Sequence, residues 1–168
     1  MAIAYRHSAA VAAIGLKGDE AVLEIGCGHG VAVRLVLERL TTGSITALDR
    51  SAKMIEALEA SIGSDPRLRT RPEALEDADW GDEQFDAIFA VNLDFNLRLG
   101  TRWPSMLKAR LKSGGRLVLA FDPPEESKGH AFVGKSLDRL ASEGFEAVLL
   151  PVYGKVTVIR AVAAPPFP

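Results

Sequence analysis

The sequence predicts a three-layer α/β fold in which helices cover both faces of a seven-stranded, mostly parallel sheet. Apolar runs typical of buried strands alternate with amphipathic helical patterns along residues 19–163, which indicates parallel β-α-β units. The last two apolar runs, at residues 145–150 and 155–163, are separated by four residues only. A parallel return needs a crossover of a dozen or more residues, so we expect this final pair to be antiparallel.

The chain is long enough for one domain with a substantial core. Of its 168 residues, 48% are hydrophobic and 25% charged, which is ordinary for a globular protein. We expect strands at residues 21–25, 44–48, 67–71, 84–92, 116–121, 145–150 and 155–163, and helices at residues 1–15, 30–41, 52–61, 102–111 and 131–142. Residues 1–18 are expected to form an N-terminal helix or lid, residues 19–163 the core, and residues 164–168 a loose tail.

The first strand ends in a turn that contains three glycines. Residues 22–30 read Val-Leu-Glu-Ile-Gly-Cys-Gly-His-Gly, and a helical pattern begins directly after them. A turn without side chains lets a ligand lie against the backbone, near free N–H groups and the positive end of a helix dipole. The alternative is a tight turn whose glycines have only a steric purpose.

The spacing of these glycines differs from the dinucleotide-binding fingerprint. That fingerprint, Gly-x-Gly-x-x-Gly/Ala, needs a small sixth residue for close packing of helix on strand, and Val31 occupies this position. The pattern that is present, Glu-x-Gly-x-Gly-x-Gly, resembles the first motif of the class I S-adenosylmethionine-dependent methyltransferases. The resemblance extends over most of residues 19–163, including the strand that follows Gly114 and Gly115, and it implies the strand order 3-2-1-4-5-7-6 with the last strand antiparallel.

The resemblance implies S-adenosyl-L-methionine as the cofactor and S-adenosyl-L-homocysteine as the product. This cofactor carries an ammonium and a sulfonium group, so the Glu24 carboxylate at the end of the strand would face positive charge. Cys27 is interpreted as a small residue that fits the turn. The implied cofactor-binding residues are Glu24, Gly26, Cys27, Gly28, Gly30, Asp49, Arg50, Glu73, Ala74 and Asn92.

Asp49 ends the second strand and is the predicted ribose ligand. In an open α/β sheet, an acid at this position lies beside the ligand crevice, where it accepts hydrogen bonds from the ribose hydroxyls. The alternative is a helix cap, because Asp49 and Ser51 precede the helix at residues 52–61 and both side chains suit an N-cap.

Glu73 and Ala74 match the acid-plus-small pair that family members carry near the adenine amino group. The alternative is a solvated loop, because an acidic stretch runs from Glu73 to Asp82.

The fourth strand leads into residues 92–97, where polar and apolar side chains alternate. Their position at the carboxyl end of a strand indicates a substrate-side wall, and the alternative is a polar turn before the next helix. The candidate substrate-pocket residues are Tyr5, His7, Asn92, Asp94, Phe95 and Asn96.

No residue is assigned as catalytic, and Asp94 and His130 are the candidates for a general base. Methyl transfer from a sulfonium needs a base only where the acceptor must lose a proton. His130 follows the fifth strand, at the edge where ligands bind in such sheets.

The composition of the chain argues against several classes of binding partner. The net charge of -2 gives no electrostatic basis for nucleic-acid binding. The single cysteine excludes an intrachain disulfide and a cysteine-cluster metal site, and no metal is expected. No apolar run approaches the ~20 residues of a membrane span, and the N-terminus lacks the pattern of a signal peptide. We therefore expect a cytoplasmic, soluble protein; a homodimer would add pocket walls, although no sequence feature indicates one.

The leading hypothesis is S-adenosylmethionine-dependent methyl transfer to a small-molecule acceptor, since the chain leaves no room for a large recognition domain. The main alternative is a non-catalytic domain of the same fold that binds the cofactor or works through protein contacts. A nicotinamide-dependent oxidoreductase is disfavoured by Val31. An aminopropyltransferase is disfavoured because, apart from Asp94, paired acids for a polyamine are not evident.

Overall fold

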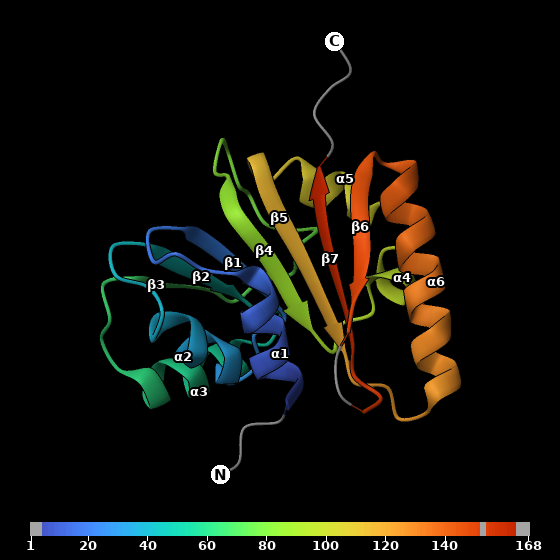
Figure 1. Ribbon diagram of the computed structural model, residues 1–168. Helices are drawn as coiled ribbons and strands as arrows, with labels where there is room; N and C mark the ends of the chain where they lie inside the picture. The colour runs from blue at the N-terminus through green and yellow to red at the C-terminus, as the bar shows by residue number, and fades with distance from the viewer. Residues whose placement is uncertain (1–4, 152–153, 164–168) are drawn as a thin grey trace.

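Seven strands form one sheet with helices on both of its sides (Figure 1), in a computed structural model that describes residues 5–151 and 154–163. The strands are β1 (Ala21–Ile25), β2 (Ser44–Leu48), β3 (Leu68–Arg71), β4 (Phe85–Val91), β5 (Leu111–Phe121), β6 (Phe145–Leu150) and β7 (Thr157–Ala163). The helices are α1 (Tyr5–Ile14), α2 (Val31–Leu37), α3 (Ala52–Ile62), α4 (Phe95–Arg98), α5 (Trp103–Lys108) and α6 (Glu126–Ser142). None of the helices in this described part of the chain is long and apolar enough to cross a membrane.

The strand order is β3-β2-β1-β4-β5-β7-β6, which places β1 in the middle of the sheet. β1 pairs in parallel with β2 and β4, so Ala47 and Phe89 are the cross-strand neighbours of Glu24. β7 runs antiparallel to both β5 and β6. The predicted fold class, strand order and antiparallel last strand are confirmed; the predicted connection at residues 151–154 includes two residues outside the described part.

The sheet separates two hydrophobic cores, because successive residues of a strand point to opposite faces. Val22 and Phe89 pack with α1, α2 and α3 on one face. Leu23 and Ile88 pack with α4, α5 and α6 on the other face. Burial on both faces explains why the central strands are apolar along their whole length.

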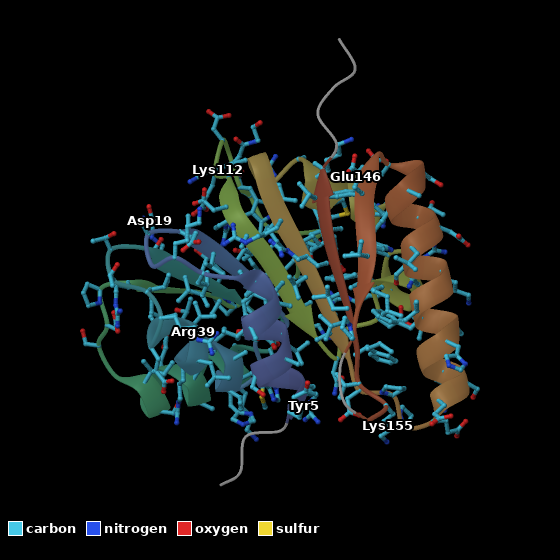
Figure 2. All side chains as sticks on the ribbon, viewed as in Figure 1. Tyr5, Asp19, Arg39, Lys112, Glu146 and Lys155 are labelled. Carbon is cyan, nitrogen blue, oxygen red and sulfur yellow. The ribbon has the colours of Figure 1, made fainter. Side chains whose placement is uncertain are left out.

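The carboxyl ends of the parallel strands lie together on one side of the molecule, and a ligand site is expected there. Tyr5 and Lys155 lie at this end in Figure 2, whereas Asp19, Lys112 and Glu146 lie at the opposite end.

Helix α1 belongs to the core, which corrects the expectation of a separate lid. Its residues Ala10, Val11 and Ile14 are fully buried against the first core. Arg6 in its first turn pairs with Asp122 after β5, at 3.1 Å between Nη1 and Oδ2. These contacts fix the helix on the sheet; residues 1–4 of the predicted lid and residues 164–168 of the predicted tail lie outside the described residues.

The largest differences from the predicted strand and helix starts are at β5 and α6, and α4 is a helix that was not predicted. β5 begins at Leu111, which was expected to end a helix, because the glycine-containing segment at residues 112–115 lies inside the strand as an irregularity where the pairing register shifts. Helix α6 begins at Glu126, before the predicted start at residue 131, so residues 127–129 are helical. Gly129 permits this, since a Cβ there would lie 2.9 Å from Pro123 Cγ.

Candidate functional site

The glycine turn after β1 is joined to the end of β2. The amides of Gly26 and Cys27 donate to the Leu48 carbonyl at 2.7 and 3.1 Å. Gly26 and Gly28 have φ values of 73° and 53°, a left-handed conformation that glycine adopts readily. No heavy atom lies within 4 Å of the position that a Gly28 Cβ would take. The backbone at Gly28 is therefore open to a ligand.

Gly30 has a different reason to be glycine. Its φ is 87°, and a Cβ there would lie 2.8 Å from Leu58 Cγ of α3. Gly30 therefore lets the start of α2 pack against α3. The sequence motif alone does not tell whether a glycine serves such packing or the binding of a ligand.

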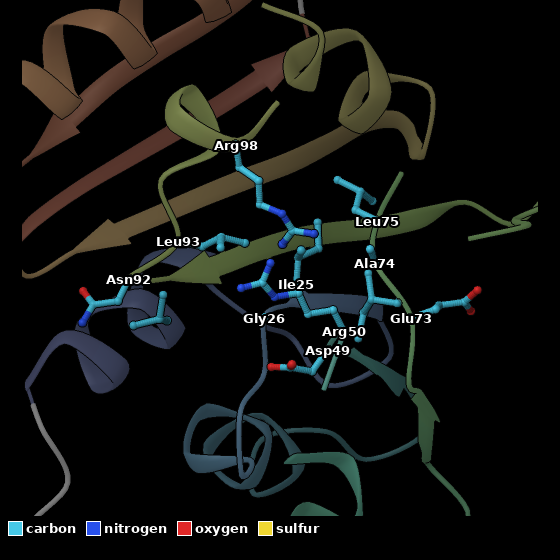
Figure 3. A pocket seen from close by; sticks show the side chains of 12 residues that line it. Ile25, Gly26, Asp49, Arg50, Glu73, Ala74, Leu75, Asn92, Leu93 and Arg98 are labelled. Atoms are coloured by element: carbon cyan, nitrogen blue, oxygen red, sulfur yellow. The ribbon is translucent and has the colours of Figure 1, made fainter. Parts of the chain in front are cut away.

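A cavity of about 200 Å³ lies beside the turn, at the carboxyl ends of β1 to β4 (Figure 3). It is lined by Ile25, Gly26, Leu48, Asp49, Arg50, Glu73, Ala74, Leu75, Val91, Asn92, Leu93 and Arg98. Predicted cofactor-binding residues from four different segments thus line one cavity, although Gly26 and Asn92 are 66 positions apart in the sequence.

Asp49 connects the glycine turn to the segment after β2. Its Oδ2 accepts from the Gly28 amide at 2.9 Å, and its Oδ1 accepts from the Ser51 amide at 2.9 Å. Ser51 is the residue that caps α3, because its side chain accepts from the Met54 amide. A carboxylate oxygen accepts more than one hydrogen bond, so Asp49 retains capacity for the hydroxyls of a ligand.

Glu24 is buried on the sheet face that α1, α2 and α3 cover. Its exposed fraction is 2%, and its Oε2 has no hydrogen-bond partner among the described residues. Burial raises the pKa of Glu24 well above its usual range, and the nearby Asp49 carboxylate raises it further. An unsatisfied buried carboxyl oxygen costs free energy that a cationic ligand group would recover.

Cys27 lies under the turn with 6% exposure, and its Sγ is 3.6 Å from the Gly28 carbonyl oxygen. Burial raises the pKa of the Cys27 thiol, and the neighbouring carboxyl groups of Glu24 and Asp49 raise it further. A buried neutral thiol packs as a small apolar group rather than acting as a nucleophile.

Glu73 lines the cavity, but its carboxylate is engaged by a neighbour. Arg71 Nε donates to it at 2.5 Å, and the Glu73 side chain points away from the centre of the cavity in Figure 3. The Arg71 guanidinium also lies 4.3 Å from the centroid of the Trp80 ring. These contacts order the part of the wall that contains Glu73 and Ala74, whereas the acids that follow in the same loop, Glu76, Asp77 and Asp79, are exposed.

Asn92 ends β4 in a left-handed conformation with φ of 56°, which is uncommon for a residue other than glycine. Its amide donates to the Ala120 carbonyl at 2.8 Å, and its Oδ1 accepts from the Asp122 amide at 2.7 Å. The side-chain oxygen of Asn92 therefore joins the ends of β4 and β5.

The structure gives Asp94, Phe95 and Asn96, which were assigned to the substrate side, other contacts. Asp94 caps α4, since its side chain accepts from the Asn96 amide at 2.9 Å. Phe95 is 2% exposed and stacks on Trp103. Asn96 is also buried, and its side chain bonds to Ser136 Oγ at 2.9 Å and to Trp103 Nε1 at 3.1 Å. Residues 95–98 are helical rather than extended, so Phe95 and Asn96 both point into the core on the sheet face that α4, α5 and α6 cover.

The other candidates also lie away from the cavity lining. His130 is exposed on α6, and Tyr5 and His7 belong to the first turns of α1. Within the described residues, none of the base candidates lines the cavity.

Leu93, from the predicted wall at residues 92–97, lines the cavity, and so does Arg98, which was not singled out from the sequence. Leu93 Cδ2 lies 3.4 Å from the position of a Gly26 Cβ, over the turn. Arg98 donates to the Glu76 carboxylate at 3.0 and 3.3 Å, and Figure 3 shows the guanidinium groups of Arg50 and Arg98 directed into the cavity. The short helix α4 places Arg98 at the cavity. Arg98 could have been found from the sequence only if residues 95–98 had been predicted as helical.

An open glycine turn after the first strand and an acid after the second define an α/β domain of the kind that binds nucleotide-like ligands at its strand ends. The chain belongs to the methyltransferase domain family, whose model matches residues 22–115.

Curated relatives are longer than this chain. It is 32% identical to a protein-L-isoaspartate O-methyltransferase of Methylorubrum populi over 154 residues, which cover 89% of this chain and 63% of that protein. It is 34% identical to a ribosomal protein L11 methyltransferase of Cupriavidus necator over 110 residues, which cover 62% of this chain and 33% of that protein.

Solved structures of low sequence identity share the fold. The N-methyltransferase NodS from Bradyrhizobium japonicum, in complex with S-adenosyl-L-homocysteine, aligns with a TM-score of 0.76 at 15% identity, covering 96% of this chain and 87% of that one. A Haloferax volcanii chain from a complex of the Trm112 methyltransferase activator with a methyltransferase aligns with a TM-score of 0.78 at 15% identity, covering 94% of this chain and 89% of that one.

Proposed function

We propose that the chain binds S-adenosylmethionine across the glycine turn and transfers its methyl group to an acceptor. The observation that carries the proposal is the junction of Gly28 and Asp49, where a backbone free of side-chain neighbours and a strand-end carboxylate meet. Membership of the methyltransferase domain family supports it.

The residues present fit this cofactor. The ammonium and sulfonium groups suit the unsatisfied carboxyl group of Glu24, and the ribose hydroxyls suit Asp49. The ordered wall with Ala74 and the side chain of Leu93 provide apolar surface for the adenine ring. When bound, the cofactor supplies an activated methyl group for displacement by the acceptor.

The chain's own contribution is alignment and exclusion of water. Since no base candidate lines the cavity within the described residues, the proposal favours an acceptor that is nucleophilic without losing a proton to the protein. Carboxylates and neutral amines meet this condition.

A small molecule remains the proposed acceptor, in keeping with the net charge of -2. A protein acceptor is the second candidate, because the names of the isoaspartate and L11 relatives refer to protein methylation. Incubation of the protein with methyl-labelled S-adenosylmethionine and a cell extract, followed by separation by size, distinguishes them. Label in a low-mass product that is separated from the remaining S-adenosylmethionine supports the first acceptor class, and label in the protein fraction supports the second.

Isothermal titration calorimetry with S-adenosylmethionine and S-adenosylhomocysteine tests the cofactor itself, with NADH as the competing ligand class. We expect both adenosyl ligands to bind and NADH not to bind. Binding of neither adenosyl ligand would contradict the proposal. Binding without label transfer to either fraction would favour the non-catalytic alternative.

A further inference from the structure

The carboxyl group of Glu24 combines three features. It is 2% exposed, its Oε2 has no hydrogen-bond partner within the described residues, and a second acid, Asp49, is close enough to act on it. Asp49 holds the amide of Gly28, so the two acids share the immediate neighbourhood of the open turn.

The elements around Glu24 offer little charge to compensate it. Its cross-strand neighbours are Ala47 on β2 and Phe89 on β4. The side chains of α1, α2 and α3 that pack on this face are apolar. The titratable or charged groups of the turn and the neighbouring elements are Cys27, His29, Asp49, Arg50, Tyr5, Arg6, His7, Arg34, Glu38, Lys53, Glu56 and Glu59, of which Tyr5 and Arg50 are exposed.

The arginine and lysine side chains among these groups do not provide a buried cation. Arg6 is paired with Asp122. Arg34 and Lys53 are exposed on their helices, as are the acids Glu38, Glu56 and Glu59. Only Asp49 acts on the titration of Glu24 besides burial, and its charge opposes ionisation. A buried carboxyl group in such surroundings is neutral, because an isolated buried charge is strongly unfavourable.

We infer that binding of the cationic cofactor expels the proton of Glu24, so that the affinity of the site rises with pH. This inference rests on the proposed function, because the cofactor's ammonium group is the cation that the carboxylate would meet. The charge balance is simple: the carboxylic acid becomes a carboxylate, one proton enters solvent, and the ligand cation neutralises the new charge. Burial of the pair is tolerated because its charges are opposite and close together.

Calorimetric titration with S-adenosylhomocysteine, which retains the ammonium group, tests the inference. The same titration is run at one pH in phosphate and in Tris buffer, whose ionisation enthalpies differ, so the difference in heat counts the protons released. For the unmodified chain we expect proton release that approaches one per ligand, and an affinity that rises about tenfold per pH unit, over the pH range in which Glu24 is protonated in the free protein.

Glu24→Gln and Glu56→Gln form a matched pair of variants. Glu56 is exposed on α3, so its replacement should leave proton release and its pH dependence unchanged. Glutamine has the shape of the protonated acid, so Glu24→Gln should fold, bind more weakly and release no proton. A second measurement needs no ligand: the carboxyl carbon of Glu24, followed by NMR in labelled free protein, should titrate with a pKa well above the usual range of a glutamate, and this signal should be lost in Glu24→Gln.

The outcomes separate the inference from the function beneath it. Tight binding with no proton release, or equal release by Glu24→Gln, would overturn the inference and leave the proposed function standing. Absence of S-adenosylhomocysteine binding at every pH would instead remove the proposed function, and the inference with it.

Discussion

Glu20 and Glu24 lie at opposite ends of β1, and both are buried, with exposed fractions of 6% and 2%. Glu20 accepts from the amides of Lys17 and Gly18 and from the Arg116 guanidinium, all at 2.8–3.0 Å. Burial alone would raise the pKa of Glu20, but these donors together outweigh burial and lower it to about 2.

Glu24 has the opposite environment, with an unsatisfied oxygen and a raised pKa. Hydrogen bonds within the fold therefore satisfy the carboxylate at the amino end of the strand, whereas Glu24 Oε2 at the carboxyl end has no partner among the described residues. Changes at the carboxyl end should therefore affect binding, and changes at the amino end should affect stability.

The largest expected effect comes from filling the open turn. Gly28→Val should lower the affinity for S-adenosylhomocysteine by at least ~1,000-fold, about 4 kcal/mol, because a branched side chain occupies the ligand's approach. Gly81→Val is the control, since Gly81 also has an open, left-handed position, with φ of 49°, but lies outside the cavity lining. Both variants carry roughly 1–2 kcal/mol of backbone strain. Equal binding by the two, measured by calorimetry, would break the comparison.

A change at Glu20, at the amino end of β1, should lower the stability of the fold. Glu20→Gln is expected to lower the free energy of unfolding by about 3 kcal/mol at pH 7, because it removes one partner of the buried pair with Arg116. The folded-state pKa of Glu20 lies below its ordinary value, so its contribution is present above the unfolded-state pKa and is lost as pH falls toward about 2. Urea unfolding at pH 7 and pH 3 should show the difference shrinking with acidification. A stability loss without this pH dependence would contradict the ion-pair account.

Removal of the ribose ligand should have an intermediate effect. Asp49→Ala should weaken S-adenosylhomocysteine binding by at least ~1.5 kcal/mol, about tenfold, because charge-assisted hydrogen bonds to the ligand are lost. Asp79→Ala is the control, because Asp79 also accepts from the amide two residues ahead, that of Gly81, at 3.1 Å, outside the cavity lining. Unchanged affinity of the Asp49 variant would remove the ribose assignment.

The smallest effect concerns the stability of the free protein. Glu24→Gln should raise the melting temperature slightly at pH 7, the reverse of Glu20→Gln. The raised pKa of Glu24 means that folding must keep it protonated, so its unfavourable contribution grows as pH rises above the unfolded-state pKa. At pH 4 the two proteins should melt alike. A lower melting temperature of the variant at pH 7 would indicate a charged Glu24 in the free fold.

The fold was predictable from the sequence because its signals are local. The apolar run at residues 21–25, the glycines that follow it, and the short link between the last two strands specify the sheet without knowledge of distant contacts. Asp49 was found for the same reason, since its position after a strand places it at the cavity.

The remainder of the site depends on contacts between distant residues. Asn96 turns inward because Ser136, 40 positions further along the chain, meets its side chain. Arg98 reaches the cavity only because α4 forms and Glu76 receives it. Periodicity over a few residues did not separate this short helix from an alternating wall. The raised pKa of Glu24 follows from its burial in the fold and from the nearby Asp49 carboxylate, which the sequence does not show.

A crystal structure of the protein grown with S-adenosylhomocysteine tests the central claim most directly. The account predicts density for the ligand across Gly26 and Gly28, with both ribose hydroxyls within hydrogen-bond distance of Asp49 and the ammonium group beside Glu24. Ligand bound elsewhere, or a side chain of the protein filling the turn while Asp49 faces no ligand, would contradict it.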